Sequence, residues 1–221
     1  MTVLREPTAP ELAIRTAAIL LVFVVVFTAL LAFAYQVTRP AILASAAEEK
    51  MKLIGEMLPP SRYDNALLAD VLTLPPTPEL GLAETSTVYR ARRDGKAEAL
   101  VLEAIAPDGY AGKIRLVVTV NADGSVAGVR VIAHKETPGL GDYIEPKKDR
   151  KRARPWITQF EGRALGNPGE RGWKVKKDGG EFDANAGATV TPRAIVKAVK
   201  RTLDYVAAHR EALYAKAGGQ P

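Results

Sequence analysis

The sequence predicts an α+β fold: a single N-terminal transmembrane helix, then a domain with an antiparallel sheet and packed helices. Three observations predict it. A run of twenty residues without a charge, Thr16 to Tyr35, lies near the N-terminus. Two segments with alternating β-branched residues, 113–120 and 126–134, flank a turn sequence with no helix between them, which is typical of an antiparallel pair. After Pro192 the apolar residues recur at helical spacing.

The composition excludes several kinds of site. The chain has 221 residues and a formal charge of +6. This mild excess of basic residues does not indicate nucleic-acid binding, because no recognition fold for nucleic acid accompanies it. It has no cysteine, which excludes disulfides, thiolate metal sites and cysteine-ligated iron–sulfur clusters. Its two histidines, His134 and His209, form no nucleophile–base pattern. We therefore predict no metal site and no catalytic side chain, and any redox chemistry needs a cofactor held without cysteine.

The uncharged run predicts a membrane span. A helix rises about 1.5 Å per residue, so twenty residues cross a hydrocarbon core of about 30 Å. A cleaved signal peptide is the alternative, because Ala32-Phe33-Ala34 resembles a cleavage site, but the run exceeds the usual ~7–15 apolar residues. We expect a short cytoplasmic tail at 1–15 and a transmembrane helix at 16–37. The flanking charges do not fix its orientation.

Residues 38–85 are expected to connect this helix to a domain at 86–215. Apolar residues recur on one face from Pro40 to Leu58, which predicts a packed helix ended by Pro59-Pro60. Residues 61–85 are rich in Pro and Leu and are expected to be irregular.

Two hairpins are expected inside the domain. The first runs from a strand opening at Thr87 through the Asp94-Gly95 turn to a strand at 97–106. The second joins 113–120 to 126–134. A short strand is predicted at 173–177. Trp156, Ile157 and Phe160 are expected in the core.

The loop His134–Asp142 (HKETPGLGD) is a candidate ligand loop. Its central residues are Thr137, Pro138, Gly139, Leu140 and Gly141. Proline and two glycines set an unusual backbone path and permit close approach to a ligand, and the leucine offers an apolar surface to a flat ring. An ordinary turn is the alternative. The loop is not a dinucleotide fingerprint, because the glycine spacing stops early and no helix follows.

The segment Lys147–Arg154 has six basic residues in eight. It is either a solvated loop or an electrostatic patch for anionic lipid head groups or an acidic partner subunit.

The stretch Asp183–Pro192 (DANAGATVTP) precedes the last helical pattern. Thr191-Pro192 is read as a helix start, with threonine as the cap, and such a start can hold a phosphate. Gly187 and Ala188 leave room for a bulky group to approach the hydroxyl of Thr189. A polar loop before a capped helix is the alternative. The helix is expected to continue to Gly218-Gly219, with one apolar face: Ile195, Val196, Val199, Leu203 and Val206.

The residues 183–189 (DANAGAT) resemble the flavinylation motif Asp-x-x-(Ser/Thr)-Gly-Ala-Thr, with Ala186 where the motif has a hydroxyl. Together with HKETPGLGD, KKDGGEFD and GATVTPRAIVKAVK, they resemble the FMN-binding domain of the G subunit of Rnf-type electron-transport complexes. The C subunit of the sodium-translocating NADH:quinone oxidoreductase is a related protein. The resemblance covers the anchor and residues 86–210.

The resemblance implies one FMN joined by a phosphodiester to Thr189. A flavin transferase would recognise Asp183, Gly187 and Ala188 and make this bond. The implied cofactor-binding residues are those of the loop 137–141 with Gly187, Ala188 and Thr191. An FMN-binding domain on the periplasmic side of the cell inner membrane is expected.

The resemblance also implies a function. The chain would carry electrons among other membrane subunits of a complex that couples ferredoxin–NAD redox chemistry to ion translocation. Two alternatives stay open: a stand-alone membrane-anchored flavoprotein that serves a separate extracytoplasmic reductase, and an assembly subunit without flavin.

Overall fold

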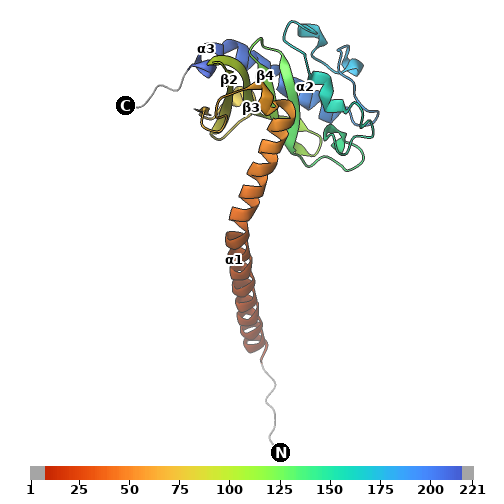
Figure 1. Ribbon diagram of the computed structural model, residues 1–221. Coiled ribbons are helices and arrows are strands. Elements are labelled where there is room, and N and C mark those ends of the chain that lie inside the picture. The colour runs from red at the N-terminus through yellow and green to blue at the C-terminus, as the bar shows by residue number, and fades with distance from the viewer. Residues whose placement is uncertain (1–7, 216–221) are drawn as a thin grey trace, which may run out of the picture. The chain divides into compact units, whose positions relative to one another are not determined.

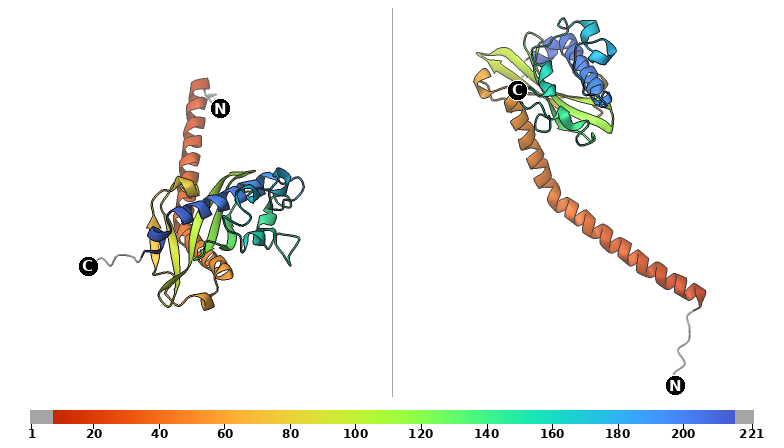
Figure 2. Two further views of the ribbon diagram at one scale, coloured as in Figure 1. Left: turned by 90° about the horizontal axis from the view of Figure 1, so that it is seen from above. Right: turned by 90° about the vertical axis from the view of Figure 1, so that its right-hand side faces the viewer.

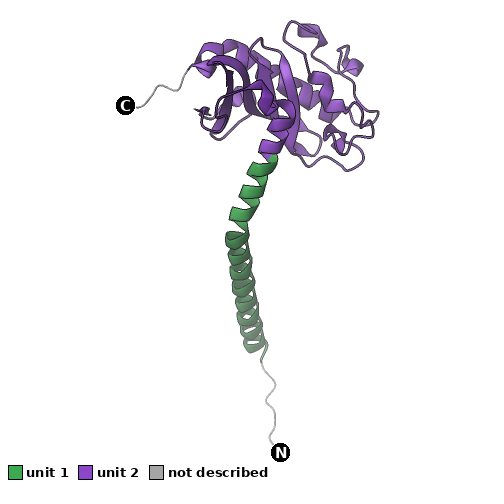
Figure 3. Cartoon of the chain, in the orientation of Figure 1, with its two compact units in different colours: residues 1–49 green, residues 50–221 purple. Residues whose placement is uncertain are grey.

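The protein is seen here as a computed structural model, which describes residues 8–215. The chain divides into two compact units, residues 1–49 and 50–221 (Figure 3). The described part of the first unit is helical from Ala9 onward, and the second unit is the α+β domain that the sequence predicts.

Helix α1 (Ala9–Met57) is continuous over 49 residues (Figure 1). It is the one helix in residues 8–215 that is long and apolar enough to cross a membrane. The predicted stop before Pro59-Pro60 is confirmed. The helix expected at 16–37 and the helix expected from Pro40 to Leu58 were predicted as two elements, and this is wrong: they form one helix. Proline removes only one backbone donor, and strong helix formers follow it. Residues 9–15 of the expected tail are also helical.

Five antiparallel strands form one sheet in the order β1-β2-β3-β4-β5 (Figures 1 and 2). Their bounds are β1 Val71–Leu74, β2 Ser86–Arg93, β3 Lys96–Gly109, β4 Gly112–Asn121 and β5 Val126–Ala133. Both predicted hairpins are confirmed. The expectation that 61–85 is irregular is wrong at β1, an edge strand of four residues followed by two prolines. Such a strand is too short to show an alternating pattern.

Both faces of the sheet are covered. Helix α2 (Val190–Ala208) lies across one face, over inward-pointing side chains of β3 and β4 (Figure 2). Ile54, Met57 and Leu58, at the end of α1 and just after it, pack on the other face against Val101 and Val117. The apolar stripe predicted for α2 is therefore confirmed as a packing face. The stripe predicted from Pro40 to Leu58 packs only from Met51 onward, since Leu43 and Ala47 are exposed. Burial on two sides also explains why β3 and β4 read as nearly continuous apolar runs.

The chain between β5 and α2 contains only short 3-10 turns: Asp142–Ile144, Trp156–Phe160, Glu170–Gly172 and Lys176–Asp178. The core positions predicted at Trp156, Ile157 and Phe160 are buried. The strand predicted at 173–177 is wrong. Val175 makes only an isolated bridge to Phe182, whose ring stacks 4.9 Å from that of Phe160. The alternation there reflects packing into an aromatic cluster and not a sheet.

The C-terminal helix ends earlier than expected. Helix α2 stops at Ala208, and a short helix α3 (Arg210–Tyr214) follows His209. Gly218-Gly219, the predicted stop, lie outside the described residues. Arg92 donates a hydrogen bond to the carbonyl of Tyr214 at 2.9 Å and ties this end of the chain to the sheet.

Acid should weaken the domain partly through Glu103. Burial acts to raise the pKa of this carboxyl, but hydrogen bonds and charge from Lys50 (2.5 Å) and Arg115 (2.8 Å) outweigh it and lower the pKa. A lowered folded pKa adds stability that is present above the unfolded value of about 4.3 and lost as pH falls through the folded value. We expect the loss of urea stability between pH 7 and pH ~3.5 to be smaller in Glu103→Gln than in the wild type. Equal losses would contradict this assignment.

Candidate functional site

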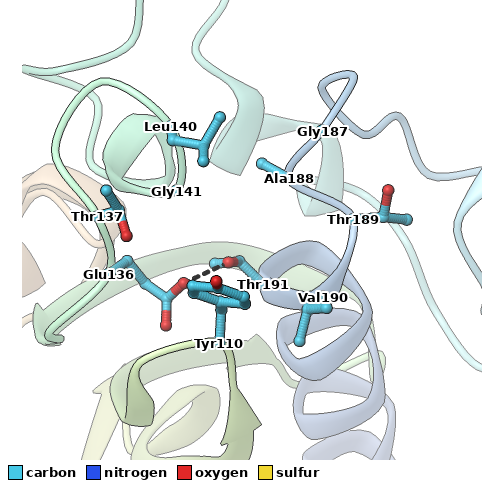
Figure 4. A pocket seen from close by; sticks show the side chains of 10 residues that line it. All are labelled: Tyr110, Glu136, Thr137, Leu140, Gly141, Gly187, Ala188, Thr189, Val190 and Thr191. Atoms are coloured by element: carbon cyan, nitrogen blue, oxygen red, sulfur yellow. Dashed lines mark hydrogen bonds between the residues drawn. The ribbon is translucent and has the colours of Figure 1, made fainter.

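A pocket of about 120 Å³ lies between the loop after β5 and the start of α2 (Figure 4). It is lined by Tyr110, Glu136, Thr137, Leu140, Gly141, Gly187, Ala188, Thr189, Val190 and Thr191. These residues come from three separate parts of the chain: the β3–β4 turn, the HKETPGLGD loop, and the DANAGAT stretch with the first two residues of α2. The two stretches singled out in the sequence therefore meet in space, 45 or more residues apart in the chain.

The wall of this pocket holds most of the large apolar side chains that are exposed among residues 50–215. Four large apolar side chains are exposed among residues 50–215, and three of them line the pocket: Tyr110 (70% exposed), Leu140 (47%) and Val190 (42%). The fourth is Leu68. Exposed apolar side chains that are scattered singly are normal on a protein surface. Several of them gathered at one hollow typically mark a binding surface. Tyr110 and Val190 carried no signal in the sequence.

A buried carboxylate joins the walls of the pocket. Glu136 is only 4% exposed, and its Oε2 accepts a hydrogen bond from the hydroxyl of Thr191. Its Oε1 accepts the backbone N–H of Ala111 at 3.1 Å, and its own N–H donates to Nδ1 of His134 at 2.9 Å. One side chain thus ties the β3–β4 turn, the HKETPGLGD loop and α2 together. Only the position of Glu136 inside the loop motif hinted at this role.

The loop itself is braced by its own backbone. The carbonyl of Thr137 accepts the N–H groups of Leu140 (3.1 Å) and Gly141 (2.9 Å). Gly139, at a φ of 74°, donates its N–H to the buried carboxylate of Asp142 at 2.8 Å. The leucine therefore stands on a fixed turn over the pocket, as Figure 4 shows.

Two aromatic side chains hold the stretch before α2. The hydroxyl of Tyr143 donates to the carbonyl of Ala188 (3.3 Å) and accepts the N–H of Asn185 (3.4 Å). Burial raises the pKa of this tyrosine, so the hydroxyl stays protonated as a donor at neutral pH. The indole N–H of Trp156 donates to the carbonyl of Asp183 at 2.6 Å. Gly187 turns the chain with a φ of 81°, a conformation that favours glycine.

The hydroxyl of Thr189 is free at the start of α2. Thr189 is the N-cap residue, its side chain makes no capping hydrogen bond, and its Oγ1 has no partner within residues 8–215. In Figure 4 this side chain points away from Leu140 and Thr137. The first backbone bond of the helix runs from Arg193 N–H to the Thr189 carbonyl at 3.3 Å, so the N–H groups of residues 190 and 191 come before it. An unbonded hydroxyl and unused backbone N–H donors therefore lie together at the start of α2.

Some predicted site residues lie outside the pocket, and one that lines it has another role than expected. Thr191 is not the helix cap: it is 1% exposed inside the first turn, and its hydroxyl is committed to Glu136. Pro138 does not line the pocket, and Gly139 lines a neighbouring hollow on the other side of Leu140. Asp183 lines a separate polar hollow, where it pairs with Lys176 at 2.6 Å, and it does not line the pocket of Thr189.

Gly141 should be sensitive to a single added methyl. Its backbone is in the right-handed region, which alanine tolerates, but a Cβ would lie 2.9 Å from Glu136 Oε2 and 3.2 Å from Thr191 Oγ1. We expect Gly141→Ala to cost about 1–3 kcal/mol in urea unfolding, because it forces apart a buried hydrogen bond. Gly166→Ala is the matched control, since a Cβ there meets nothing within 4 Å. Equal stability of the two variants would count against the role of Glu136 as a clamp.

The matches to known families cover most of the chain. Residues 11–57 match the family described as RnfG N-terminal region, and residues 109–204 match the FMN-binding domain. The second match contains every residue that lines the pocket. The fit is consistent with the structure: the pocket offers an apolar wall for a ring, a free hydroxyl and helix N–H groups for a phosphate.

Curated relatives agree with both family matches. A Pseudomonas aeruginosa protein (strain UCBPP-PA14), named as the G subunit of the ion-translocating oxidoreductase complex, is 48% identical over 203 residues, which cover 91% of this chain and 92% of that protein. Proteins of the same name from Vibrio cholerae (strain M66-2) and Shewanella oneidensis are 42% and 40% identical, and the aligned parts cover 89% and 92% of this chain and 91% and 93% of those proteins. The chain belongs to the family of G subunits of ion-translocating oxidoreductase complexes, with an FMN-binding domain and, within residues 8–215, one candidate membrane span.

Proposed function

We propose that this chain carries one FMN, joined by its phosphate to Thr189, and relays electrons within an ion-translocating oxidoreductase complex. The observation that supports this most directly is the free, half-buried hydroxyl of Thr189 at the edge of the apolar pocket. The other hydroxyl of the GATVT stretch, on Thr191, is buried and already bonded, so it is a poor acceptor.

The size of the pocket gives a reason for a covalent bond. Sites that enclose a small molecule without covalent help typically have volumes of roughly 300–1,000 Å³, whereas this pocket has about 120 Å³. A ligand resting there keeps much of its surface in contact with solvent or a partner. A phosphodiester retains the cofactor without deep burial, and it leaves an edge open for electron exchange.

Helix α2 supplies charge stabilisation for the ester. A phosphodiester keeps one negative charge, and the N-terminus of a helix of 19 residues carries a partial positive charge and unused N–H groups. Leu140 and Tyr110 supply apolar surface beside it. The N–H groups of the loop 137–141 are our candidates for stabilising negative charge on the reduced ring.

The chemistry of the reaction belongs to the cofactor, which takes up and releases electrons; the protein positions it. By the names of its relatives, the complex moves ions. We propose that it couples ferredoxin and NAD redox chemistry to that movement, that the other membrane subunits are its partners, and that a flavin transferase loads the FMN by recognising Asp183, Gly187 and Ala188. We place the domain on the periplasmic side of the cell inner membrane, with α1 as a single-pass anchor.

Ala186 departs from the flavinylation motif without blocking this proposal. Its side chain is exposed and lines the neighbouring hollow, away from the pocket of Thr189. A hydroxyl at this position would therefore face that hollow, and we expect Ala186→Ser to leave the yield of flavinylated chain within about twofold of the wild type, since exposed substitutions usually have small effects.

Two measurements test the proposal. The chain is made with and without a flavin transferase, unfolded and run on a denaturing gel under ultraviolet light; fluorescence is expected only with the transferase. The tagged chain is then purified from its own membranes in mild detergent, and the other membrane subunits are expected to accompany it. A colourless chain would contradict flavin attachment. A fluorescent chain that purifies alone would favour the stand-alone flavoprotein.

A further inference from the structure

The net charge of the chain is concentrated in one segment. The basic loop, residues 147–154, contains six Lys or Arg residues and one Asp, so its net charge is +5 where that of the whole chain is +6. The rest of the protein is therefore nearly balanced. A charge concentrated in this way produces a local potential that attracts an oppositely charged partner, which a dispersed charge does not.

This basic loop has a fixed shape. Its one acid, Asp149, is 5% exposed and accepts the backbone N–H groups of Lys151 (2.9 Å) and Trp156 (2.6 Å). The tryptophan is buried in the main core, so the carboxylate fastens the middle of the loop to the domain. The basic side chains stand in solvent around it. A pre-shaped charged surface loses less entropy on binding than a freely moving one.

The basic loop also lies beside the candidate flavin site. A hollow of about 420 Å³ is lined both by Gly139 and Leu140 of the HKETPGLGD loop and by the basic residues Lys148, Arg150 and Lys151. The carboxylate of Glu145 contacts the ring of His134, where the HKETPGLGD loop begins, and the ammonium group of Lys148 at 3.0 Å. The apolar edge of the pocket and the cationic surface are thus continuous through Leu140.

Most of these cations are not neutralised within the domain. Among residues 8–215 the basic loop makes one ion pair, between Lys148 and Glu145. No acidic side chain of the described chain lies within ion-pair distance of the other five. The adjacent polar hollow is lined by two acids from outside the basic loop, Glu181 and Asp183, and these are paired with Arg163 and Lys176 instead.

We infer that the basic loop and Leu140 form the docking surface for an acidic partner protein that exchanges electrons with the FMN. The inference rests on the proposed function. A partner bound here covers the open edge of the pocket, and its negative charge is drawn to that edge. A membrane surface would use the same cations, but it would cover the edge with lipid, which exchanges no electrons. The position beside the pocket therefore favours a protein.

The test uses two redox probes that share one haem. Ferricytochrome c is basic, and succinylation of its lysines makes it acidic. The full chain, loaded with FMN, is placed in nanodiscs of neutral phosphatidylcholine and reduced. Two ferric haems then take the two electrons held by one reduced FMN, its protons leave to water, and stopped-flow absorbance follows the haem.

The variant is Arg150→Glu/Lys151→Glu/Arg152→Glu. The control, Lys96→Glu/Arg171→Glu/Lys177→Glu, makes the same charge change at exposed residues that line none of the described pockets.

The charge reversal in the basic loop is expected to slow the acidic probe at least about tenfold at low salt and to speed the basic one, because steering scales with local potential. The control should change either rate less than about twofold. High salt should remove the difference in rate between the charge-reversed variant and the wild type, because it screens charge. Equal effects of the two variants would overturn the inference. So would a loss of the reversal effect in nanodiscs with anionic phosphatidylglycerol, which would assign the basic loop to lipid. A chain that shows no in-gel fluorescence carries no covalent FMN and will reduce neither probe. That result would contradict the proposed function itself.

Discussion

Thr189→Val is expected to abolish covalent FMN while the domain stays folded. Valine has nearly the shape of threonine but no oxygen to esterify. The lost hydroxyl makes no hydrogen bond within residues 8–215, so its removal leaves no partner unsatisfied. We expect no in-gel flavin fluorescence. The free energy of unfolding in urea should change by less than about 0.5 kcal/mol. Electron transfer through the assembled complex should fall at least about a hundredfold, since a step that needs the cofactor is missing.

Two companion variants make this result specific. Thr189→Ser keeps the oxygen and should retain fluorescence. Thr73→Val removes an exposed threonine hydroxyl from β1, far from the motif in sequence, and should behave as the wild type in every measurement. Fluorescence that survives in the valine variant would show that another residue carries the flavin.

Glu136→Ala is expected to have the largest effect on stability among the site variants. It removes the acceptor for the buried hydroxyl of Thr191, which lines the pocket, and for the backbone N–H of Ala111 in the β3–β4 turn. Each donor left unsatisfied costs roughly 1–3 kcal/mol, so the free energy of unfolding should fall by about 2–5 kcal/mol. The yield of flavinylated chain should fall with it, because the two walls that meet at Glu136 separate.

The size of that effect is judged against an exposed carboxylate. Asp108 pairs with Lys197 at 2.9 Å on the surface, and Asp108→Ala should cost less than about 1 kcal/mol. Glu136→Gln keeps one acceptor oxygen and should fall between the two in urea unfolding. If Glu136→Ala is no worse than the surface variant, the buried carboxylate is not the clamp of the pocket.

The sequence was informative where a pattern repeats or a motif is specific. Residues 113–120 and 126–134 alternate over a full strand length, and α2 repeats its apolar face over several turns, so the sheet and the covering helix were predictable. Strand β1 was missed because four residues followed by two prolines are too few to show a period. The apparent strand at 173–177 was produced by aromatic packing, which has no fixed period.

The site was predictable by motif but not by contact. The meeting of Leu140 with Gly187 and Ala188 followed from reading two stretches as one family signature. The clamp at Glu136 depends on a hydrogen bond across 55 residues of chain, which no local pattern encodes. For the same reason Thr191 was misread as a cap: its sequence context is that of a helix start, while its hydroxyl is used in a tertiary contact.

The most direct test of the account is a mass spectrum of one peptide from the mature protein. Trypsin should release residues 178–193, in which Thr189 and Thr191 are the only hydroxyl-bearing side chains. We predict a mass increase equal to FMN less one water, and fragment ions that place it on Thr189. An unmodified peptide from chain made with its flavin transferase, or an adduct on Thr191, would contradict the account.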